Sequence, residues 1–150
     1  MEKYKFFEHT ADAKFQAYGK TLEEAFSNAA LAMFSTMVDT SKIKPAIMKK
    51  IVVEGKNEEA LLYNWLEELL FFLDSELFIL NSVKKFEISK ATIEDEEGEE
   101  QEVFRASVVV MGDTSNDTYE LKGEVKAVTY NEMKIVKEED KVMVQVVVDL

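Results

Sequence analysis

Apolar residues recur at helical spacing in two segments of the chain. In the first, they repeat every three or four positions over Leu22–Met37, and Thr21 stands three residues before Glu24, which is the spacing of a capping box. We therefore expect a helix that begins after Thr21 and ends near residue 38. The second segment has apolar and polar residues on opposite faces, which predicts a strongly amphipathic helix. Its apolar face consists of Leu61, Leu62, Trp65, Leu66, Leu69, Leu70 and Leu73.

Most of the remaining apolar positions are typical of β-strands. In the first half of the chain, the expected strands are Lys3–Phe7, Lys14–Tyr18 and Lys50–Glu54. In the second half, they are Val83–Ile93, Glu102–Met111, Glu120–Thr129, Met133–Lys137 and Val142–Val148, with a turn-rich loop at Gly112–Thr118. The last strand is almost continuously β-branched, as is usual for a strand buried on both faces. The order predicts a single α+β domain over residues 1–150, with two main helices packed on a largely antiparallel β-sheet.

Two strand-to-helix junctions resemble each other. Both Gly19–Ala25 and Gly55–Ala60 begin with Gly-Lys and then contain Glu-Glu-Ala before a helix. The likeness is consistent with an internal duplication. The Glu-Glu-Ala runs are offset by one residue and the residue types are common, so chance explains the likeness equally well.

Composition limits the chemistry that this chain can perform. The 150 residues are 47% hydrophobic and 11% aromatic, which is enough for one packed core. Cysteine is absent, and this excludes disulfides, thiolate zinc sites and a cysteine nucleophile. A single histidine, His9, argues against a histidine-rich metal site or a serine–histidine triad. With no signal-peptide pattern and no apolar run near the roughly 20 residues that cross a bilayer, we expect a cytoplasmic protein that does not bind a membrane.

The chain is strongly acidic. Its 18 Lys+Arg and 30 Asp+Glu give a formal charge of −12, which argues against strong direct binding of nucleic acid. Seven of the nine residues in Glu94–Glu102 are acidic. This run is interpreted as a solvated hairpin tip, or alternatively as a surface for a cation or a basic partner. It lacks the register of an EF-hand calcium loop.

A few carboxylates are candidates for a metal site. Asp149 follows the most apolar strand, so its side chain and the α-carboxylate of Leu150 are expected at one fixed place. Asp12 lies in the first tight turn and could add a third carboxylate, and such oxygens suit calcium or magnesium. Alternatively, Asp12 caps its turn and Asp149 is an ordinary solvated strand end. For His9 the two interpretations are a donor that orders the turn and a general acid–base.

An ordered set of motifs resembles the archease family over essentially the whole chain. The motifs are His9-Thr10-Ala11-Asp12, Gly19 followed by Thr21–Phe26, Ala32–Phe34, Trp65–Leu70, Val125–Tyr130 and Asp149-Leu150. The resemblance implies a non-enzymatic activator of an RtcB-type RNA ligase. That ligase joins 2′,3′-cyclic phosphate or 3′-phosphate RNA ends to 5′-hydroxyl ends in tRNA splicing and RNA repair. The activator promotes guanylylation of the ligase and multiple turnover, and it reaches RNA only through the ligase.

The same resemblance implies roles for individual residues. The family's metal site, seen with calcium, corresponds here to Asp12, Asp149 and Leu150, and Lys126 occupies a position implied to matter for activation. Many members have histidine where this chain has Asn131. Because asparagine does not titrate, a proton-transfer role at that position is in doubt.

Two other functions stay open. A general chaperone or scaffold for RNA-modifying enzymes would need an exposed apolar patch, for which Phe71, Phe72 and Phe78 are candidates unless they belong to the core. A metal-dependent hydrolase would use the same carboxylates, although the chain offers no clear general base beside them.

Overall fold

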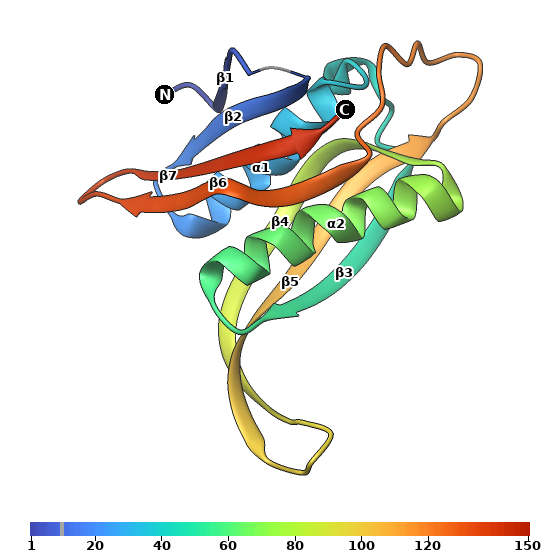
Figure 1. Ribbon diagram of the computed structural model, residues 1–150. Helices are drawn as coiled ribbons and strands as arrows, with labels where there is room; N and C mark the ends of the chain where they lie inside the picture. Colours follow the sequence, from blue (N-terminus) through green and yellow to red (C-terminus); the bar gives the residue numbers. More distant parts are fainter. Residues whose placement is uncertain (10) are drawn as a thin grey trace.

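The computed structural model describes residues 1–9 and 11–150. These residues form seven β-strands, two α-helices and one short 3-10 helix (Figure 1). In chain order they are β1 (Tyr4–Phe7), β2 (Asp12–Gly19), α1 (Leu22–Ser35), η1 (Thr40–Lys42), β3 (Ile47–Gly55), α2 (Glu58–Glu76), β4 (Phe78–Glu94), β5 (Glu100–Thr114), β6 (Ala127–Lys137) and β7 (Val142–Asp149). The expected α+β class with two main helices is confirmed. No helix in the described part of the chain is long and apolar enough to cross a membrane.

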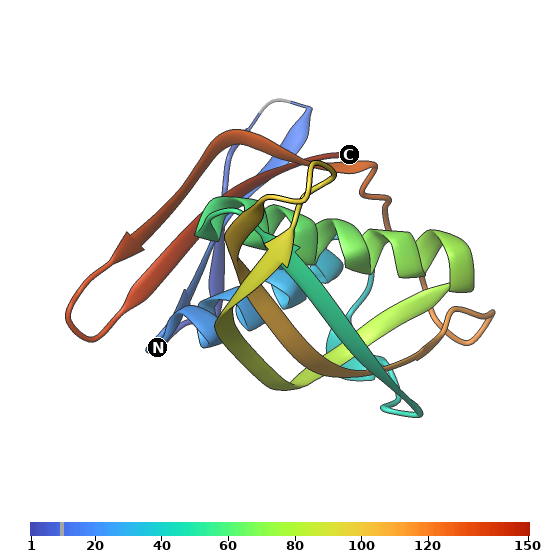
Figure 2. The same ribbon diagram turned by 90° about the horizontal axis from the view of Figure 1, so that it is seen from below.

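The strands form two antiparallel sheets rather than one. The first has the order β1-β2-β7-β6, and the second has the order β3-β5-β4. Both helices lie between the sheets, and each contacts strands of both (Figure 2). One face of each sheet therefore packs on the helices.

This middle position explains the composition of the helices. Four alanines of α1 are fully buried, so the helix lies close to its neighbours on several sides. Trp65 of α2 is fully buried, and its indole Nε1 donates a hydrogen bond to the Phe26 carbonyl of α1 at 3.0 Å. Phe86 of β4 packs edge-on against both Trp65 and Phe26. These contacts join the helices and the second sheet into one core.

The two strand-to-helix junctions have the same geometry. A Cβ on Gly19 would lie 2.5 Å from the backbone nitrogen of Ala25, and one on Gly55 would lie 2.4 Å from that of Leu61. Only glycine lets each helix begin so close to the strand before it. In both units, the glycine precedes the helix nitrogen that it approaches by the same number of residues.

Capping and side-chain hydrogen bonds extend this repeat. Thr21 and Asn57 are the N-caps of α1 and α2, as the capping pattern predicted for Thr21. Asn28 donates to the Tyr18 carbonyl and Asn64 donates to the Glu54 carbonyl, each at 2.7 Å. These residues stand at matching positions in the two units, which favours the duplication. The Glu-Glu-Ala runs that first suggested it are not in structural register.

The strand predictions for the segment before β7 were wrong in part. We expected a strand at Glu120–Thr129, a break, and another at Met133–Lys137. Instead, residues 120–126 are not strand, and β6 is continuous over Ala127–Lys137. The backbone amide of Lys122 donates to the Met37 carbonyl at 2.8 Å, so this alternating stretch packs beside the end of α1 instead of pairing in a sheet.

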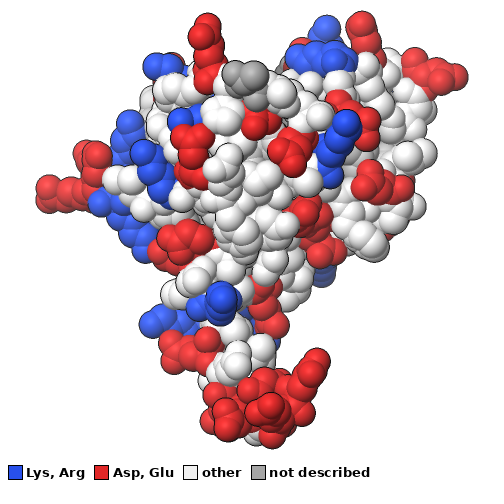
Figure 3. All heavy atoms as spheres, viewed as in Figure 1, with Lys and Arg blue, Asp and Glu red and all other residues white. Residues whose placement is uncertain are grey.

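The expected loop at Gly112–Thr118 begins later, because β5 extends to Thr114. At its other end, β5 pairs with β4 in a long hairpin that projects from the body (Figure 1). The structure places the acidic run Glu94–Glu102 at the tip of this hairpin, where Figure 3 shows a dense group of acidic side chains. Asp95 orders the tip by accepting hydrogen bonds from the backbone amides of Glu97 and Glu99.

Candidate functional site

The structure brings Asp12 and Asp149 together across two neighbouring strands. They are directly opposite each other in the β2–β7 pair, so their side chains lie on the same face of the first sheet. β7 lies between β2 and β6, and Val144 and Val146 to Val148 are fully buried. Asp149 is therefore the last residue of a strand that is buried along most of its length. Like charges at directly opposite positions are unfavourable unless a cation or a donor lies between them.

Lys126 and Leu150 lie at the same end of the sheet. The backbone amide of Lys126 donates to the Asp149 carbonyl at 2.8 Å, and Ala127 is paired with Asp149 in the β6–β7 ladder. These bonds tie the end of β7 to the start of β6. Leu150 follows directly and is 45% exposed. Asp12, from the start of the chain, and Lys126, Asp149 and Leu150, from its last 25 residues, thus lie in one region.

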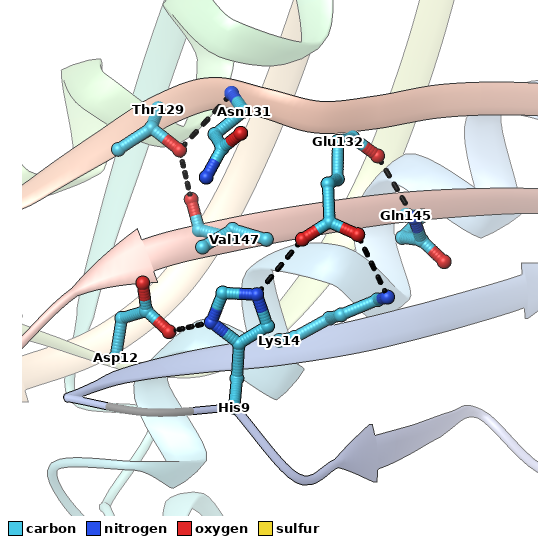
Figure 4. A network of polar contacts seen from close by, with 8 residues as sticks. All are labelled: His9, Asp12, Lys14, Thr129, Asn131, Glu132, Gln145 and Val147. Carbon is cyan, nitrogen blue, oxygen red and sulfur yellow. Dashed lines mark hydrogen bonds and ion pairs between the residues drawn. The ribbon is translucent and has the colours of Figure 1, made fainter.

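His9 bridges two carboxylates (Figure 4). Its Nδ1 contacts Oδ1 of Asp12, and its Nε2 contacts Oε2 of Glu132 at 2.8 Å. Hydrogen bonds to Glu132 and then to Asp12 raise the pKa of His9 above its ordinary value of 6.5. Because both ring nitrogens are engaged, the geometry favours the ordering role over general acid–base catalysis.

Glu132, which contacts His9, was not among the site residues predicted from the sequence. Its Oε1 accepts a hydrogen bond from Lys14 Nζ at 3.1 Å. The hydrogen bonds from His9 and then Lys14 lower the pKa of Glu132. It projects from a bulge in β6, where the register shifts between Thr129 and Lys134, and its φ of 55° is in the left-handed region. Periodicity does not predict where such a bulge directs a side chain.

A chain of amides supports the bulge from within the sheet. Gln145 Nε2 donates to the Glu132 carbonyl at 2.8 Å, and Gln16 Nε2 donates to Gln145 Oε1 at 3.0 Å. The Tyr18 hydroxyl donates to Gln16 Oε1 at 2.9 Å. Gln145 is only 5% exposed, and it is the one polar residue within the apolar run of β7. That interruption was the available sequence signal for a polar network here.

Asn131 contributes a backbone hydrogen bond to the bulge of β6. Its amide donates to Thr129 Oγ1 at 3.2 Å, and the Thr129 hydroxyl donates to the Val147 carbonyl at 2.8 Å (Figure 4). Asn131 therefore helps to shape the bulge that carries Glu132. Its amide side chain supplies no titratable group, so the network uses His9 and the carboxylates for charge.

Carboxylate oxygens are the ligands that a hard cation such as calcium prefers. Within residues 1–9 and 11–150, no three His, Cys, Asp or Glu side chains are grouped to hold a metal ion. The available oxygens are instead those of two aspartates, Asp12 and Asp149, and of the Leu150 α-carboxylate. Since His9 already contacts Asp12 and Glu132, it is better suited to orient Asp12 than to bind a cation itself.

The candidate phenylalanine patch is not continuous. Phe78 is 3% exposed and belongs to the core, and Phe72 is partly buried against it. Lys49 Nζ lies 4.4 Å from the centre of the Phe72 ring. Phe71 is 59% exposed. Of the three candidates, therefore, only Phe71 offers a large apolar surface.

Comparisons with known proteins agree over the full chain. The sequence profile of the Archease protein family matches residues 4–150. The chain is 40% identical to "Protein archease" of Methanothermobacter thermautotrophicus over 150 residues, with full coverage of both. It is also 40% identical to "Protein archease" of Thermococcus kodakarensis over 152 residues, again with full coverage.

Solved structures share the fold. The solution structure of a Methanobacterium thermoautotrophicum protein has a TM-score of 0.77 and 37% identity, and the match covers all of both chains. A crystal structure described as an archease and possible chaperone from Thermotoga maritima has a TM-score of 0.60, with 96% of this chain and 94% of that chain covered. At 17% identity, the second likeness supports the fold alone.

Proposed function

The chain belongs to the archease family, and we propose that it is a non-catalytic activator of an RtcB-type RNA ligase. It would act through a divalent-cation site, formed by Asp12, Asp149 and the α-carboxylate of Leu150, with calcium as the expected ion. The observation that carries this proposal is the direct opposition of Asp12 and Asp149 across β2 and β7. Two carboxylates held this way have a physical reason to share a cation.

The residues around the pair have distinct parts in this proposal. His9 holds one oxygen of Asp12, and Glu132 with Lys14 holds His9. The Lys126 amide fixes the backbone of Asp149. Together they keep the two carboxylates in place before a partner arrives, which reduces the ordering cost of binding.

Activation would then proceed by docking of this end of the sheet at the mouth of the ligase active site. A bound divalent cation would supply charge compensation for nucleotide phosphates there. The Asp12 and Asp149 carboxylates would hold it in one position, and the Lys126 side chain would add positive charge beside the same phosphates. The guanylylated nucleophile and the RNA belong to the ligase, consistent with the net charge of −12 on this chain.

A ligation assay tests the proposal. Purified RtcB-type ligase, GTP and excess RNA are combined with wild-type protein, Asp12→Ala or Asp149→Ala. Wild type is expected to give multiple turnovers, and each variant is expected to give none beyond the ligase alone. Asp140→Ala is the matched control, because Asp140 is an exposed aspartate in the turn between β6 and β7. Full activation by either site variant would refute the carboxylate mechanism.

A general chaperone for RNA-modifying enzymes remains the second candidate, favoured by the exposure of Phe71. It predicts that activation survives Asp149→Ala but is lost in Phe71→Ser. A metal-dependent hydrolase predicts instead that the isolated protein releases phosphate steadily from a nucleotide. Ligation assays with these variants, together with a phosphate-release assay on the isolated protein, therefore separate all three functions.

A further inference from the structure

One edge of the second sheet has unpaired backbone groups. β3 pairs with β5 on one side, and no other strand in the described part of the chain pairs with it. The Glu54 carbonyl accepts a hydrogen bond from Asn64, so it points away from β5. Because peptide groups alternate in direction along an antiparallel pair, those of Met48, Lys50 and Val52 also point to the free edge.

Large apolar side chains flank this edge. Val52 and Met48 of β3 are 61% and 58% exposed, and Phe71 of α2 is 59% exposed. Val52 and Phe71 line the same hollow between β3 and α2. A long, exposed and apolar edge strand is an aggregation hazard that proteins usually block. Lys49 and Lys50 give β3 some of this protection, but the exposed Met48 and Val52 leave apolar surface that another segment could cover.

The charge around the hollow specifies the occupant. Glu54, Glu67 and Glu68 line it, and Figure 3 shows acidic side chains along the α2 region of the surface. Arg105 Nε donates to Glu54 Oε2 at 2.6 Å and offsets that charge, but Glu67 and Glu68 have no Lys or Arg ion-pair partner in the described part of the chain. A basic segment complements them.

We propose that the free edge of β3 is a docking site for an extended segment of a partner protein. The segment alternates apolar residues with lysine or arginine, and it adds to β3 as a further strand of the second sheet. Its backbone pairs with Met48, Lys50 and Val52. Some of its side chains meet the hollow lined by Val52, Phe71 and the glutamates, and others meet the exposed Met48. This surface is separate from the carboxylate pair, which lies on the first sheet.

A peptide-binding experiment on the full-length protein tests the proposal. The probe is a heptapeptide in which valine alternates with lysine or arginine. Binding is expected to shift the NMR signals of β3 and α2 and to slow hydrogen exchange at the amides of Met48, Lys50 and Val52. Two comparison peptides separate the contributions. One carries glutamate in place of the basic residues, and the other keeps the charge but is N-methylated at alternate residues; neither is expected to bind at β3.

Two variants locate the site. Phe71→Ser is expected to raise the Kd for the basic peptide about fivefold or more, the loss typical of truncating an interface aromatic. Leu121→Ser, which removes another exposed apolar side chain away from β3, is the matched control and should leave the Kd unchanged.

Three results would overturn the proposal. One is equal binding of the N-methylated peptide, which would mean charge attraction without strand addition. Another is confinement of the NMR shifts to the acidic hairpin tip. The last is protection of the β3 amides that depends on protein concentration without peptide, which would identify a second copy as the occupant.

Discussion

Replacing Asp149 with asparagine separates the charge of the carboxylate pair from its shape. Asp149 and Asp12 are directly opposite, which places their Cβ atoms about 5 Å apart and their charges roughly 6 Å apart. In a water-like dielectric, two such charges repel by about 0.7 kcal/mol. Without a divalent cation, Asp149→Asn should therefore raise the melting temperature by about 1–3 °C. The Asp149 backbone bond to Lys126 is unaffected by this change.

Calcium should reverse the order of stability. A ligand that binds only the folded protein stabilises it by about 2.7 kcal/mol at 100 times its Kd. For a chain of this length, that corresponds to roughly 5–11 °C. Wild type should show this rise across a calcium titration, and Asp149→Asn should lose most of it. The measurement is thermal unfolding followed by circular dichroism at low ionic strength, first with a chelator and then with increasing calcium.

Asp140→Asn makes the same change in charge at the β6–β7 turn, and it should keep the calcium response of wild type. The reasoning fails if Asp149→Asn melts below wild type in chelator. It also fails if the variant keeps the full calcium-induced rise, because the cation would then be held elsewhere.

Two further predictions concern the contact between His9 and Glu132 and the packing at Gly55. Glu132→Gln should lower the pKa of His9 toward 6.5 in an NMR titration, because Glu132 is the main cause of its elevation; an unchanged pKa would contradict the contact between the two side chains. A raised folded pKa stabilises the protein below pH 6.5, and this contribution is lost as the pH rises through the folded value, so the variant should be less stabilised by mild acid. Gly55→Ala should lower the free energy of unfolding in urea by roughly 1–3 kcal/mol, since its Cβ would lie 2.4 Å from a backbone nitrogen of α2. Gly98→Ala, whose Cβ meets nothing, should cost only about 1 kcal/mol for its positive φ, and a larger loss than at Gly55 would contradict the packing argument.

Local signals predicted the helices and the buried strand well. Thr21 and the apolar repeat after it mark the start of α1 because capping depends on neighbouring residues alone. The β-branched run that became β7 is buried on both faces, as its composition predicted. The end of α1 was placed three residues too late, since apolar side chains continue past Ser35 into the turn that leads to η1.

The division into two sheets was not predictable from these signals. Alternating apolar and polar residues show that a strand has one buried face, but they do not show to which of the two sheets the strand belongs. The middle layer of helices accepts apolar faces from both sides. For the same reason, residues 120–126 were mistaken for a strand, although their alternating side chains pack beside the end of α1. Which partner an apolar face meets is decided by the whole chain.

The candidate site depends even more on long-range register. The pairing of Asp12 with Asp149 joins nearly opposite ends of the chain, and the resemblance to archeases supplied that connection before the structure did. Glu132 was missed because its direction is set by a bulge, and the bulge is supported by Gln145 and Gln16 on neighbouring strands. Only the lone glutamine in the valine run pointed to this support.

The surrounding sheet also keeps the carboxylates of Asp12 and Asp149 close together. β7 is paired on both sides, so Asp149 has little freedom to move away from Asp12 to relieve repulsion. Protonated His9 carries one positive charge. Its two ring nitrogens contact Asp12 and Glu132, so this single charge is divided between two carboxylates. The network itself joins two carboxylates, Asp12 and Glu132, to His9 and Lys14, and Asp149, opposite Asp12, adds a third carboxylate beside it. Negative charge held in place in this way lowers the stability of the fold, and the cation of the proposed function would offset that cost.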